Sequence, residues 1–338
     1  MNKLLNFDDV LIEPQFSMVR SRKDVDVSTD FLGLKLALPV LNSNMDTVAS
    51  PALCRSLGEY GTVGTLHRFW SIEENVQAFA DSIGPDNNGH SPIVSIGLGD
   101  VEFERAKALH EVGASRFMLD VAHAANIAVV EMYNKLTKEF PLSYFIVGDF
   151  GTGKEIIEFL KRVEKLPDAV KVGIGVGSVC HTKLVTGVGN AALSCLLDCA
   201  EMLDDRQIET KLILDGGVQH YGDIAKALVA GADVVISGSM FAGTDEAAGA
   251  ETYTLNRNTL EKENVKKEYR GSASLPSYKV QGKEAPWRAP EGTSITVDLK
   301  GPTIDVLNNI NGGLRSSLSY VGAFNLDEFK AKAEFQYK

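Results

Sequence analysis

The stretch KLILDGGVQHYGDIAKALVAGADVVISGS, residues 211–239, shows the pattern that decides the fold. Two short apolar runs, residues 211–214 and 234–237, have the composition of strands, and glycine turns follow both. The segment between them is long enough for one helix. Strands that alternate with helices in this way are typical of β–α–β units, in which successive strands run parallel.

The same alternation extends through most of the chain. Six further apolar runs precede this unit, at residues 38–44, 61–66, 92–98, 116–121, 143–148 and 169–174. Segments with helical spacing lie between the runs, as at residues 50–58, 71–82, 102–113 and 154–166. Eight such units in about 240 residues match the size of a (β/α)8 barrel, the TIM barrel. An open, doubly wound parallel sheet is the alternative, because periodicity does not reveal whether a sheet closes.

Two regions fall outside the alternation. Residues 1–37 form an N-terminal extension, and residues 249–301 form a long polar segment after the eighth strand, rich in Gly, Pro and Ser. Its stretch RGSASLPSYKVQGKEAPWRAPEG, residues 270–292, has no helical or strand period. A long loop that leaves the last barrel strand lies over the active-site face. We therefore expect one catalytic domain over residues 1–338 with residues 249–301 as a lid-like insertion, and a plain surface insert is the alternative.

The composition fits a cytoplasmic enzyme. The chain has 338 residues, of which 44% are hydrophobic and 23% charged, and its formal net charge is −11. Nucleic-acid-binding surfaces need clustered Lys and Arg, so the acidic balance argues against such a partner. No stretch approaches the ~20 apolar residues of a membrane span, and the N-terminus has no apolar signal core. The four cysteines show neither paired-motif spacing nor the density of a disulfide-rich protein.

A glycine-rich segment, KVGIGVGSVCHTKLVTGVG at residues 171–189, contains the candidate nucleophile. It follows the sixth predicted strand, so it leaves the barrel at the end where active sites lie. Its glycines let the main chain approach a ligand, and Ser178 with the neighbouring amides could cradle a phosphate. Cys180 lies at the tip, where a thiolate can be stabilised and can attack an electrophile. The remaining cysteines lie in apolar helical patterns, and we expect them to be inert packing residues: Cys54, Cys195 and Cys199.

Two glycine turns predict a phosphate site. Strand seven ends in Asp215-Gly216-Gly217, and strand eight ends in Gly238-Ser239. Barrel enzymes frequently bind phosphate with the loops after these two strands, and glycine amides there can donate to phosphate oxygens. Asp215 is too acidic to face phosphate and would suit a ribose diol. The alternative is that these glycines only form tight turns between strand and helix.

With these residues in place, the chain resembles the IMP dehydrogenase/GMP reductase family. The likeness covers nearly the whole length, and the Gly-Ser-x-Cys-x-Thr loop combined with the two phosphate turns is highly specific. The shared motifs, in chain order, are FDDVLIEP, NSNMDTV, GTLHR, VGIGVGSVCHT, TGVG, LDGGV, GDIAKAL, GADVVISGSMFAG, KEYRG, EGTSITVDLKGP and GGLRSSLSYVGA. The resemblance implies a TIM barrel, a purine mononucleotide (GMP or IMP) as substrate, and a homotetramer.

Within the family the chain looks more like GMP reductase than IMP dehydrogenase. Typical dehydrogenases carry a regulatory CBS-domain pair after the second strand, and only 25 residues lie between Leu66 and Pro92 here. Dehydrogenases also use an Arg-Tyr pair on a mobile flap, and none occurs between Gly271 and Gly301. The sequence WRAPEG at residues 287–292 stands there instead and is similar to the reductase motif. The implied reaction is NADPH-dependent reductive deamination of GMP to IMP and ammonia through a covalent thioimidate.

The resemblance also implies roles for individual residues. Cys180 would attack purine C2, and Thr182 with Glu291 would transfer a proton to the departing amine. The substrate would be bound by Ser178, Asp215, Gly216, Gly217, Gly238, Ser239, Gly271, Ser272, Ala273 and Arg288. The cofactor, NADPH (or NAD in a dehydrogenase), would contact Arg68, Asp120, Ala122 and His123. A potassium ion would be held by the main-chain carbonyls of Gly175, Gly177 and Cys180.

The chain departs from the family pattern at several positions. His181 replaces a common Thr, Asp149 stands where Asn is usual, and Arg68 takes the place of a reductase Lys. Residues 190–192 and 271–274 also differ from the usual sequence. These departures leave open a deoxynucleotide or an altered purine as substrate. Two further alternatives are an IMP dehydrogenase without CBS domains, which oxidises IMP to XMP with NAD, and a nucleotide-binding regulatory protein without turnover.

Overall fold

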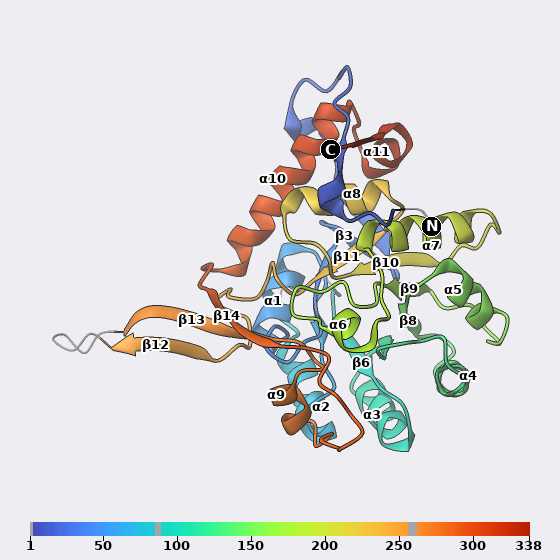
Figure 1. Cartoon of the computed structure of the whole chain (residues 1–338), viewed down its shortest axis with the longest axis vertical. Coiled ribbons are helices and arrows are strands. Elements are labelled where there is room, and N and C mark those ends of the chain that lie inside the picture. Colours follow the sequence, from blue (N-terminus) through green and yellow to red (C-terminus); the bar gives the residue numbers. More distant parts are fainter. Residues whose placement is uncertain (1–2, 85–88, 256–261) are drawn as a thin grey trace.

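Eight parallel strands form one sheet at the centre of the molecule (Figure 1). The computed structural model describes residues 3–84, 89–255 and 262–338. The strand order is β4-β11-β10-β9-β8-β7-β6-β5. The strands are β4 (Val40–Asn42), β5 (Thr65–Leu66), β6 (Ile93–Ile96), β7 (Arg116–Asp120), β8 (Tyr144–Phe150), β9 (Ala169–Val172), β10 (Lys211–Asp215) and β11 (Val234–Ser237). Each overlaps one of the eight apolar runs, so all eight predicted strands are confirmed.

The two end strands of this order, β4 and β5, meet through hydrogen bonds that involve side chains. Asn42 Nδ2 donates to the carbonyl of Thr65 at 3.0 Å, and the amide of Thr65 donates back to Asn42 Oδ1 at 2.8 Å. Thr65 Oγ1 donates to the main-chain carbonyl of Asn42 at 2.7 Å. Both residues are fully buried. The sheet is therefore a nearly closed barrel, and the predicted (β/α)8 fold is confirmed over the open-sheet alternative.

Helices connect successive strands and surround the barrel (Figure 1). They are α1 (Pro51–Tyr60), α2 (Ile72–Asp81), α3 (Asp100–Glu111), α4 (Ile127–Glu139), α5 (Gly153–Leu160), α6 (Thr182–Thr186), α7 (Ala192–Asp204) and α8 (Tyr221–Val229). Ser50 and Ser71 cap α1 and α2, because each hydroxyl accepts a hydrogen bond from an amide of the first turn. The predicted helix 154–166 is too long. The helix α5 ends at Leu160 because the amide of Arg162 then turns back to a carbonyl of its last turn.

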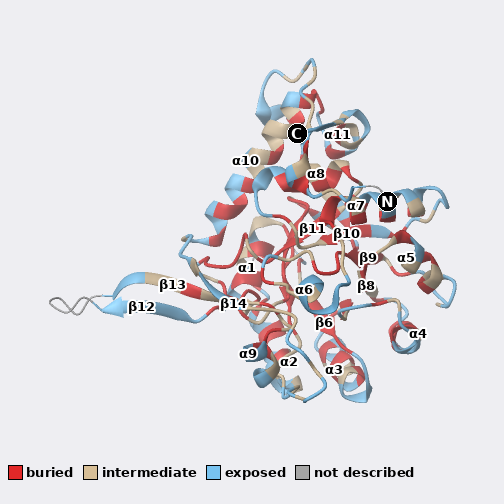
Figure 2. Cartoon of the chain, in the orientation of Figure 1, coloured by how far each residue is buried: buried red, intermediate tan, exposed pale blue. Residues whose placement is uncertain are grey.

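Buried residues concentrate in the central strands (Figure 2). Their apolar side chains form one core inside the barrel and another between the sheet and its helices. The inner cluster includes Leu41, Ile93, Met118, Ile146, Ile213 and Val234 from six strands. An N-terminal hairpin, β2 (Thr29–Phe31) and β3 (Leu34–Leu36), joins this cluster. Arg116, the first residue of β7, donates to the carbonyl of Leu32 in the hairpin at 3.0 Å. The hairpin thus closes the end where the strands begin, and the site lies at the other end.

The two chain ends lie together outside the barrel (Figure 1). The strand β1 (Val10–Ile12) pairs antiparallel with β15 (Phe335–Tyr337). Two short 3-10 helices, η1 (Phe7–Asp9) and η2 (Arg22–Asp24), and the helices α10 (Thr303–Val321) and α11 (Leu326–Lys332) complete this region. Across the described residues, no helix has both the length and the apolar character that crossing a bilayer requires.

The insertion at residues 249–301 contains more regular structure than its sequence pattern indicates. The strands β12 (Glu251–Leu255), β13 (Lys262–Arg270) and β14 (Ser294–Asp298) form an antiparallel sheet that projects from the barrel (Figure 1). Residues 256–261 of the insertion lie outside the described residues. A helix, α9 (Leu275–Val280), forms within the stretch that has no period. It is set by local chemistry, because Ser274 caps its first turn and a proline stands at its start.

A buried lysine attaches the insertion to the barrel. Lys267 in β13 is 5% exposed, and its ammonium donates to three main-chain carbonyls that follow β11. Those of Thr244, Asp245 and Ala247 each lie 2.8 Å from its Nζ. Hydrogen bonds from a charged donor are stronger than neutral ones. The base of β13 is therefore held at the mouth of the barrel.

Candidate active site

Two glycine turns and the loop that carries Cys180 line one small cavity at the mouth of the barrel. We call residues 173–190 the cysteine loop, and Gly216, Gly217, Gly238 and Ser239 the amide cradle. The cavity is lined by Val176, Gly177, Ser178, Gly216, Gly217, Val218, Gln219, Ser237, Gly238, Ser239 and Tyr269. The structure therefore brings together five of the residues that the sequence predicts to bind substrate: Ser178 and the four of the amide cradle.

The amide cradle needs glycine for steric reasons. Gly217 has a φ of +76°, in the left-handed region that glycine adopts most readily. A Cβ on Gly238 would lie 2.7 Å from the hydroxyl of Tyr269. Among the described residues, no protein group accepts a hydrogen bond from the amides of Gly217, Gly238 or Ser239. Unpaired amides around a concave surface are suited to binding a phosphate.

Tyr269 also lines the cavity, although no sequence pattern predicted this. It lies near the end of β13, is 4% exposed, and lines the cavity together with Ser178. Burial raises the pKa of Tyr269, so the hydroxyl stays protonated and can act as a donor. The sequence feature that could have indicated this residue is the tyrosine of the KEYRG motif. That this tyrosine reaches the cavity follows only from the position of β13 in the structure.

Cys180 is the one partly exposed cysteine of the described residues, and its Sγ lies 3.2 Å from Thr182 Oγ1. The other three cysteines are buried, as predicted for packing residues. Burial raises the pKa of Cys54 to about 12, so this thiol stays protonated at neutral pH. Cys195 donates from Sγ to the carbonyl of Gly151 at 3.1 Å, inside the protein. Cys180 alone combines a neighbouring hydroxyl with access to the barrel mouth.

The insertion docks on the cysteine loop through main-chain hydrogen bonds. The amide of His181 donates to the carbonyl of Glu291 at 2.6 Å, and the amide of Thr293 donates to Val179 at 2.9 Å. The amide of Glu291 in turn donates to the carbonyl of Ala273 at 2.9 Å. Two segments of the insertion, one with Glu291 and one with residues 271–274, therefore lie beside the nucleophile loop. Three predicted catalytic residues, Cys180, Thr182 and Glu291, come from one contiguous region of the structure.

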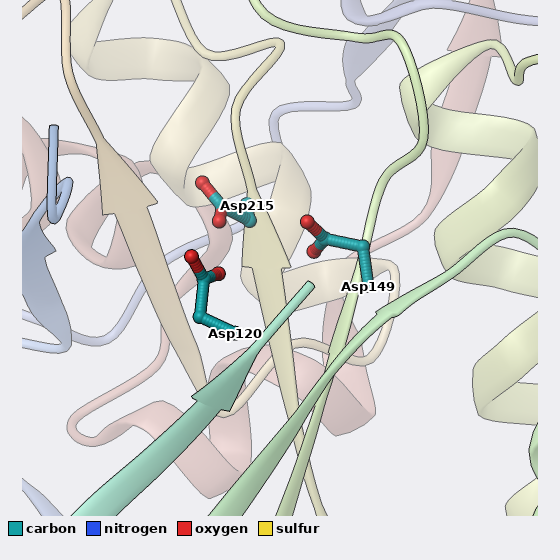
Figure 3. A group of neighbouring side chains, drawn as sticks. All are labelled: Asp120, Asp149 and Asp215. Carbon is teal, nitrogen blue, oxygen red and sulfur yellow. The ribbon is translucent and has the colours of Figure 1, made fainter. Parts of the chain in front are cut away.

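Three aspartates, Asp120, Asp149 and Asp215, converge at the ends of β7, β8 and β10 (Figure 3). They surround the buried Lys171 of β9. The Nζ of Lys171 lies 3.0 Å from Asp120, 2.8 Å from Asp149 and 2.5 Å from Asp215. The lysine side chain is 1% exposed, and the carboxylates are about one-fifth exposed. We call these four residues the acid–lysine cluster. Sequence patterns missed Lys171, and the signal was a lysine within an otherwise apolar strand.

One ammonium cannot neutralise three carboxylates, and the pKa values of the cluster reflect this. Burial, together with Asp215 and Asp120, raises the pKa of Asp149 to about 8, although Lys171 opposes the rise. Burial also disfavours the charged form of Asp120, but Lys171 and Arg68 outweigh it and lower its pKa. Burial lowers and the three carboxylates raise the pKa of Lys171, with a net rise well above its usual value. The raised pKa favours the protonated form of Asp149 at neutral pH, whereas the lowered pKa favours the ionised form of Asp120.

The predicted cofactor residues follow β5 and β7. Arg68 Nη2 lies 3.5 Å from the carbonyl of Asp120, so these two come together. Ala122 and His123 follow on the exposed rim after β7, where His123 Nε2 lies 3.6 Å from a carboxylate oxygen of Glu155. Arg68 Nε is buried, and no described group accepts its hydrogen bond. An orphaned buried donor of this kind fits a site for an anionic or polar ligand.

The cysteine loop contains the three carbonyls that the resemblance assigns to potassium. The carbonyl of Gly177 accepts the amide of Cys180 at 3.1 Å. The side chain of Lys183 passes Gly175 so closely that a Cβ there would lie 2.9 Å from Lys183 Cγ. The ammonium of Lys183 donates to the carbonyl of Asn190 at 3.3 Å. The loop thus carries a cation of its own, and the potassium site stays a prediction.

The residues of the insertion that are predicted to bind the base lie on both sides of α9. The guanidinium of Arg288 lies over the ring of Tyr278 at 5.5 Å and over Trp287 at 5.1 Å. The carbonyl of Ser272 accepts a hydrogen bond from Gln281 Nε2 at 2.9 Å. Gly271 is buried, and a Cβ there would lie 3.0 Å from the carbonyl of Val179 in the cysteine loop. The contact of residues 271–273 with the loop therefore depends on close approach of main chains.

Comparison with known proteins identifies the family of this chain. Residues 4–338 match the model of the IMP dehydrogenase / GMP reductase domain. The chain belongs to the IMP dehydrogenase/GMP reductase family. It is similar to the GMP reductase of Onchocerca volvulus, with 34% identity over 98% of this chain and 90% of that protein. It is also 34% identical to the GMP reductase of Enterobacter sp. (strain 638) and 33% identical to that of Caenorhabditis elegans. These matches cover 98% of this chain and 94% and 91% of those proteins.

Three of the positions at which the sequence analysis expects a departure from the family pattern, Asp149, Arg68 and His181, lie near the predicted site. Asp149 adds the third carboxylate to the acid–lysine cluster. Arg68 packs on Gly97, where a Cβ would lie 2.8 Å from its guanidinium carbon. His181 contacts Glu291 through main-chain atoms, so this contact places no demand on the imidazole. Two of the three departures therefore alter charge or geometry close to the predicted ligands.

Proposed function

We propose that this protein catalyses the NADPH-dependent reductive deamination of GMP to IMP and ammonia. One observation carries the proposal. A partly exposed cysteine with a hydroxyl 3.2 Å from its sulfur adjoins a cavity lined by unpaired glycine amides. A nucleotide phosphate in the cradle would direct its base along the cysteine loop. The curated relatives named above are GMP reductases, which supports the same reaction for this chain.

Substrate binding would divide between main-chain and side-chain groups. The amide cradle and Ser178 would hold the phosphate, with Tyr269 as a further donor. Asp215, which ends β10 directly before the cradle, would accept hydrogen bonds from the ribose hydroxyls. Arg288 and the main chain of residues 271–273 would bind the base. This division keeps the carboxylate of Asp215 at the sugar and away from the phosphate.

Cys180 would act as the nucleophile. Its thiolate adds to purine C2, which is electron-poor because it lies between two ring nitrogens. The C2–N bond then breaks, and its electron pair leaves with the nitrogen as ammonia. The amine needs a proton to leave, and Glu291 acting through Thr182 would supply it. A bound nicotinamide cofactor would supply the hydride for C2. Cys180 would then leave as the thiolate when the carbon–sulfur bond breaks, which releases IMP.

The residues present fit a nicotinamide cofactor beside this centre. Arg68 follows β5 and Asp120 ends β7, two strands with β6 between them, and Arg68 Nη2 reaches the carbonyl of Asp120 across that gap. Arg68 Nε is a buried donor without a described partner. Asp120 would face the cofactor while Lys171 keeps it ionised. Ala122 and His123 would form the outer part of this subsite. These residues hold and orient the cofactor and do not themselves undergo redox chemistry.

A spectrophotometric panel tests the proposal. Purified protein is mixed with GMP, dGMP or IMP and with reduced or oxidised cofactor, and absorbance of the reduced nicotinamide is followed. GMP with NADPH should give oxidation, Cys180→Ala should abolish it, and Cys195→Ala, at a buried thiol, should retain it. Reduction of NAD by IMP would instead establish a dehydrogenase. Tight nucleotide binding without any redox signal would establish a binding protein, and a response to dGMP alone would change the substrate.

A further inference from the structure

Three cations of this acidic protein gather at the cofactor side of the mouth without a carboxylate partner. They are Arg68 after β5 and Lys283 and Arg288 of the insertion. Across the described ranges, none of the three forms an ion pair, whereas Lys171 close by contacts three carboxylates. With a net charge of −11, the chain has an excess of acids that could have paired with them. Like charges held together without counterions are unfavourable unless a ligand supplies the negative charge.

Aromatic and main-chain contacts hold Arg68 and Lys283 in place. The guanidinium of Arg68 lies over the ring of Phe69 at 5.4 Å, and Lys283 Nζ lies over the same ring at 5.6 Å. Arg68 packs directly on Gly97. The amide of Lys283 donates to the carbonyl of Tyr278 at 2.9 Å, which fixes the turn after α9. The insertion therefore places Lys283 beside Arg68, whose guanidinium is held by contacts within the barrel.

The acids nearest this pair are already engaged. Glu102 accepts the amide of Gly97 at 2.7 Å and the guanidinium of Arg105 at 3.2 Å. Asp120 contacts the ammonium of Lys171 at 3.0 Å. Arg68 in addition has a buried Nε for which no described acceptor exists. The groups of Arg68 and Lys283 that remain free to form hydrogen bonds are therefore all donors. The chemical group that would accept from them is an oxyanion.

We propose that Lys283 completes, with Arg68, a subsite that binds a phosphate group of the nicotinamide dinucleotide. The substrate phosphate has its own place in the amide cradle, after β10 and β11, whereas Arg68 follows β5. The cofactor offers two kinds of phosphate, the pyrophosphate that joins its halves and the 2′-phosphate that distinguishes NADPH from NADH. This inference rests on the proposed function only in taking a nicotinamide dinucleotide as the ligand.

The local field gives the subsite a pH dependence. Burial and the positive charges of Arg68 and Arg288 lower the pKa of Lys283 to about 8, and Glu102 and Asp120 only partly oppose this. The ring that faces its ammonium is that of Phe69, and Tyr278 lies beneath Arg288. An amine that loses its proton near pH 8 loses its attraction for phosphate. Cofactor affinity should therefore fall as the pH rises from 7 to 9.

Direct binding measurements test this subsite without turnover. Titrations of NADPH and NADH, followed by cofactor fluorescence in the absence of GMP, compare the wild type with Lys283→Met. Loss of one charge-assisted contact should raise the dissociation constant about tenfold or more. Lys279→Met is the matched control, because Lys279 is an exposed lysine of α9, and it should bind like the wild type. Weaker NADPH with unchanged NADH would identify the 2′-phosphate, and weakening of both would identify the pyrophosphate.

Two further measurements check that the variant is folded and that the charge of residue 283 causes the effect. GMP affinity of Lys283→Met should equal that of the wild type, which shows that the insertion is still folded on the cysteine loop. Lys283→Arg should bind cofactor with a flat profile between pH 7 and 9. Unchanged affinity of Lys283→Met for both cofactors would overturn the inference. Because no turnover is measured, a protein that binds NADPH through Lys283 but does not convert GMP would refute the proposed function and leave the subsite standing.

Discussion

The amide cradle and the acid–lysine cluster lie at the same end of the barrel but are made of opposite kinds of group. The cradle offers the uncharged amides of Gly217, Gly238 and Ser239 after β10 and β11, and the two glycines leave no room for a side chain. The cluster holds three carboxylates, each about one-fifth exposed, around one ammonium whose side chain is 1% exposed. One part binds charge brought by a ligand, and the other neutralises charge that the chain itself carries.

The difference shows how an acidic protein can receive an anionic substrate. Amides bind phosphate without adding a charge that other side chains must balance. The carboxylates at the mouth would repel the phosphate, and Lys171 compensates them from inside the strand layer. Asp215 links the two parts, because it contacts Lys171 and directly precedes the glycines of the cradle. We expect the cluster to control folding stability and the cradle to control ligand affinity.

The largest effect should come from removal of the central cation. Lys171→Met leaves the partly buried carboxyl groups of Asp120, Asp149 and Asp215 without their ammonium partner, and we expect a loss of about 3–5 kcal/mol in the free energy of unfolding. Lys211→Met is the control, because Lys211 is nearly half exposed and pairs with Asp233 at the start of the neighbouring strand. That pair should contribute about 1 kcal/mol or less. Guanidinium denaturation at pH 7 measures both, and equal losses would contradict the role of Lys171.

A smaller effect should follow from the proton on Asp149. Its folded pKa of about 8 lies above its usual value of 3.8, so the native state binds more protons than the unfolded chain between these values. The part of the folding stability that comes from the protonated Asp149 should therefore be fully present at low pH, and it should be lost as the pH rises through 8. Between pH 5.5 and 8.5 we expect the wild type to lose about 3 kcal/mol more than Asp149→Asn. Denaturation midpoints at the two pH values measure this difference, and parallel losses would show that Asp149 is ionised throughout.

The smallest effect concerns the cradle. A Cβ at Gly238 would lie 2.7 Å from the hydroxyl of Tyr269 and 3.1 Å from Met45 Sδ, so Gly238→Ala must displace a wall of the cavity. We expect GMP affinity to fall about tenfold, or ~1.4 kcal/mol, with unfolding stability little changed. Gly222→Ala in α8 is the control, because no atom lies within 4 Å of its added Cβ. Calorimetric titration with GMP measures both variants. An unaffected Gly238→Ala would place the phosphate elsewhere.

The sequence predicts the barrel and the cradle because both depend on local pattern. Strand runs show as apolar segments, and a left-handed turn or a close main-chain approach shows as glycine, as at Gly217 and Gly238. Even the end of α5 at Leu160 differs from expectation by only a few residues. Each of these features is decided by residues that are neighbours in the chain.

The features that the sequence analysis missed depend on residues that are distant in the chain and meet only in the folded structure. Lys171 is one polar residue in an apolar strand, and its meaning depends on carboxylates that end three other strands. Tyr269 reaches the cavity because Lys267 fixes β13 to carbonyls some 20 positions earlier in the chain. Lys283 lies in a stretch without any period and is delivered to Arg68 by the turn after α9. No window of sequence contains these partners together.

The most direct test of the account is the identity of the sulfur that bonds to the purine. The protein is incubated with GMP without reduced cofactor, quenched in acid, digested and analysed by mass spectrometry. We predict that the peptide carrying Cys180 gains the mass of GMP minus ammonia, and that equimolar ammonia is released. Peptides carrying Cys54, Cys195 and Cys199 should be unchanged. A protein that converts GMP with NADPH but never bears this adduct on Cys180 would contradict the central claim.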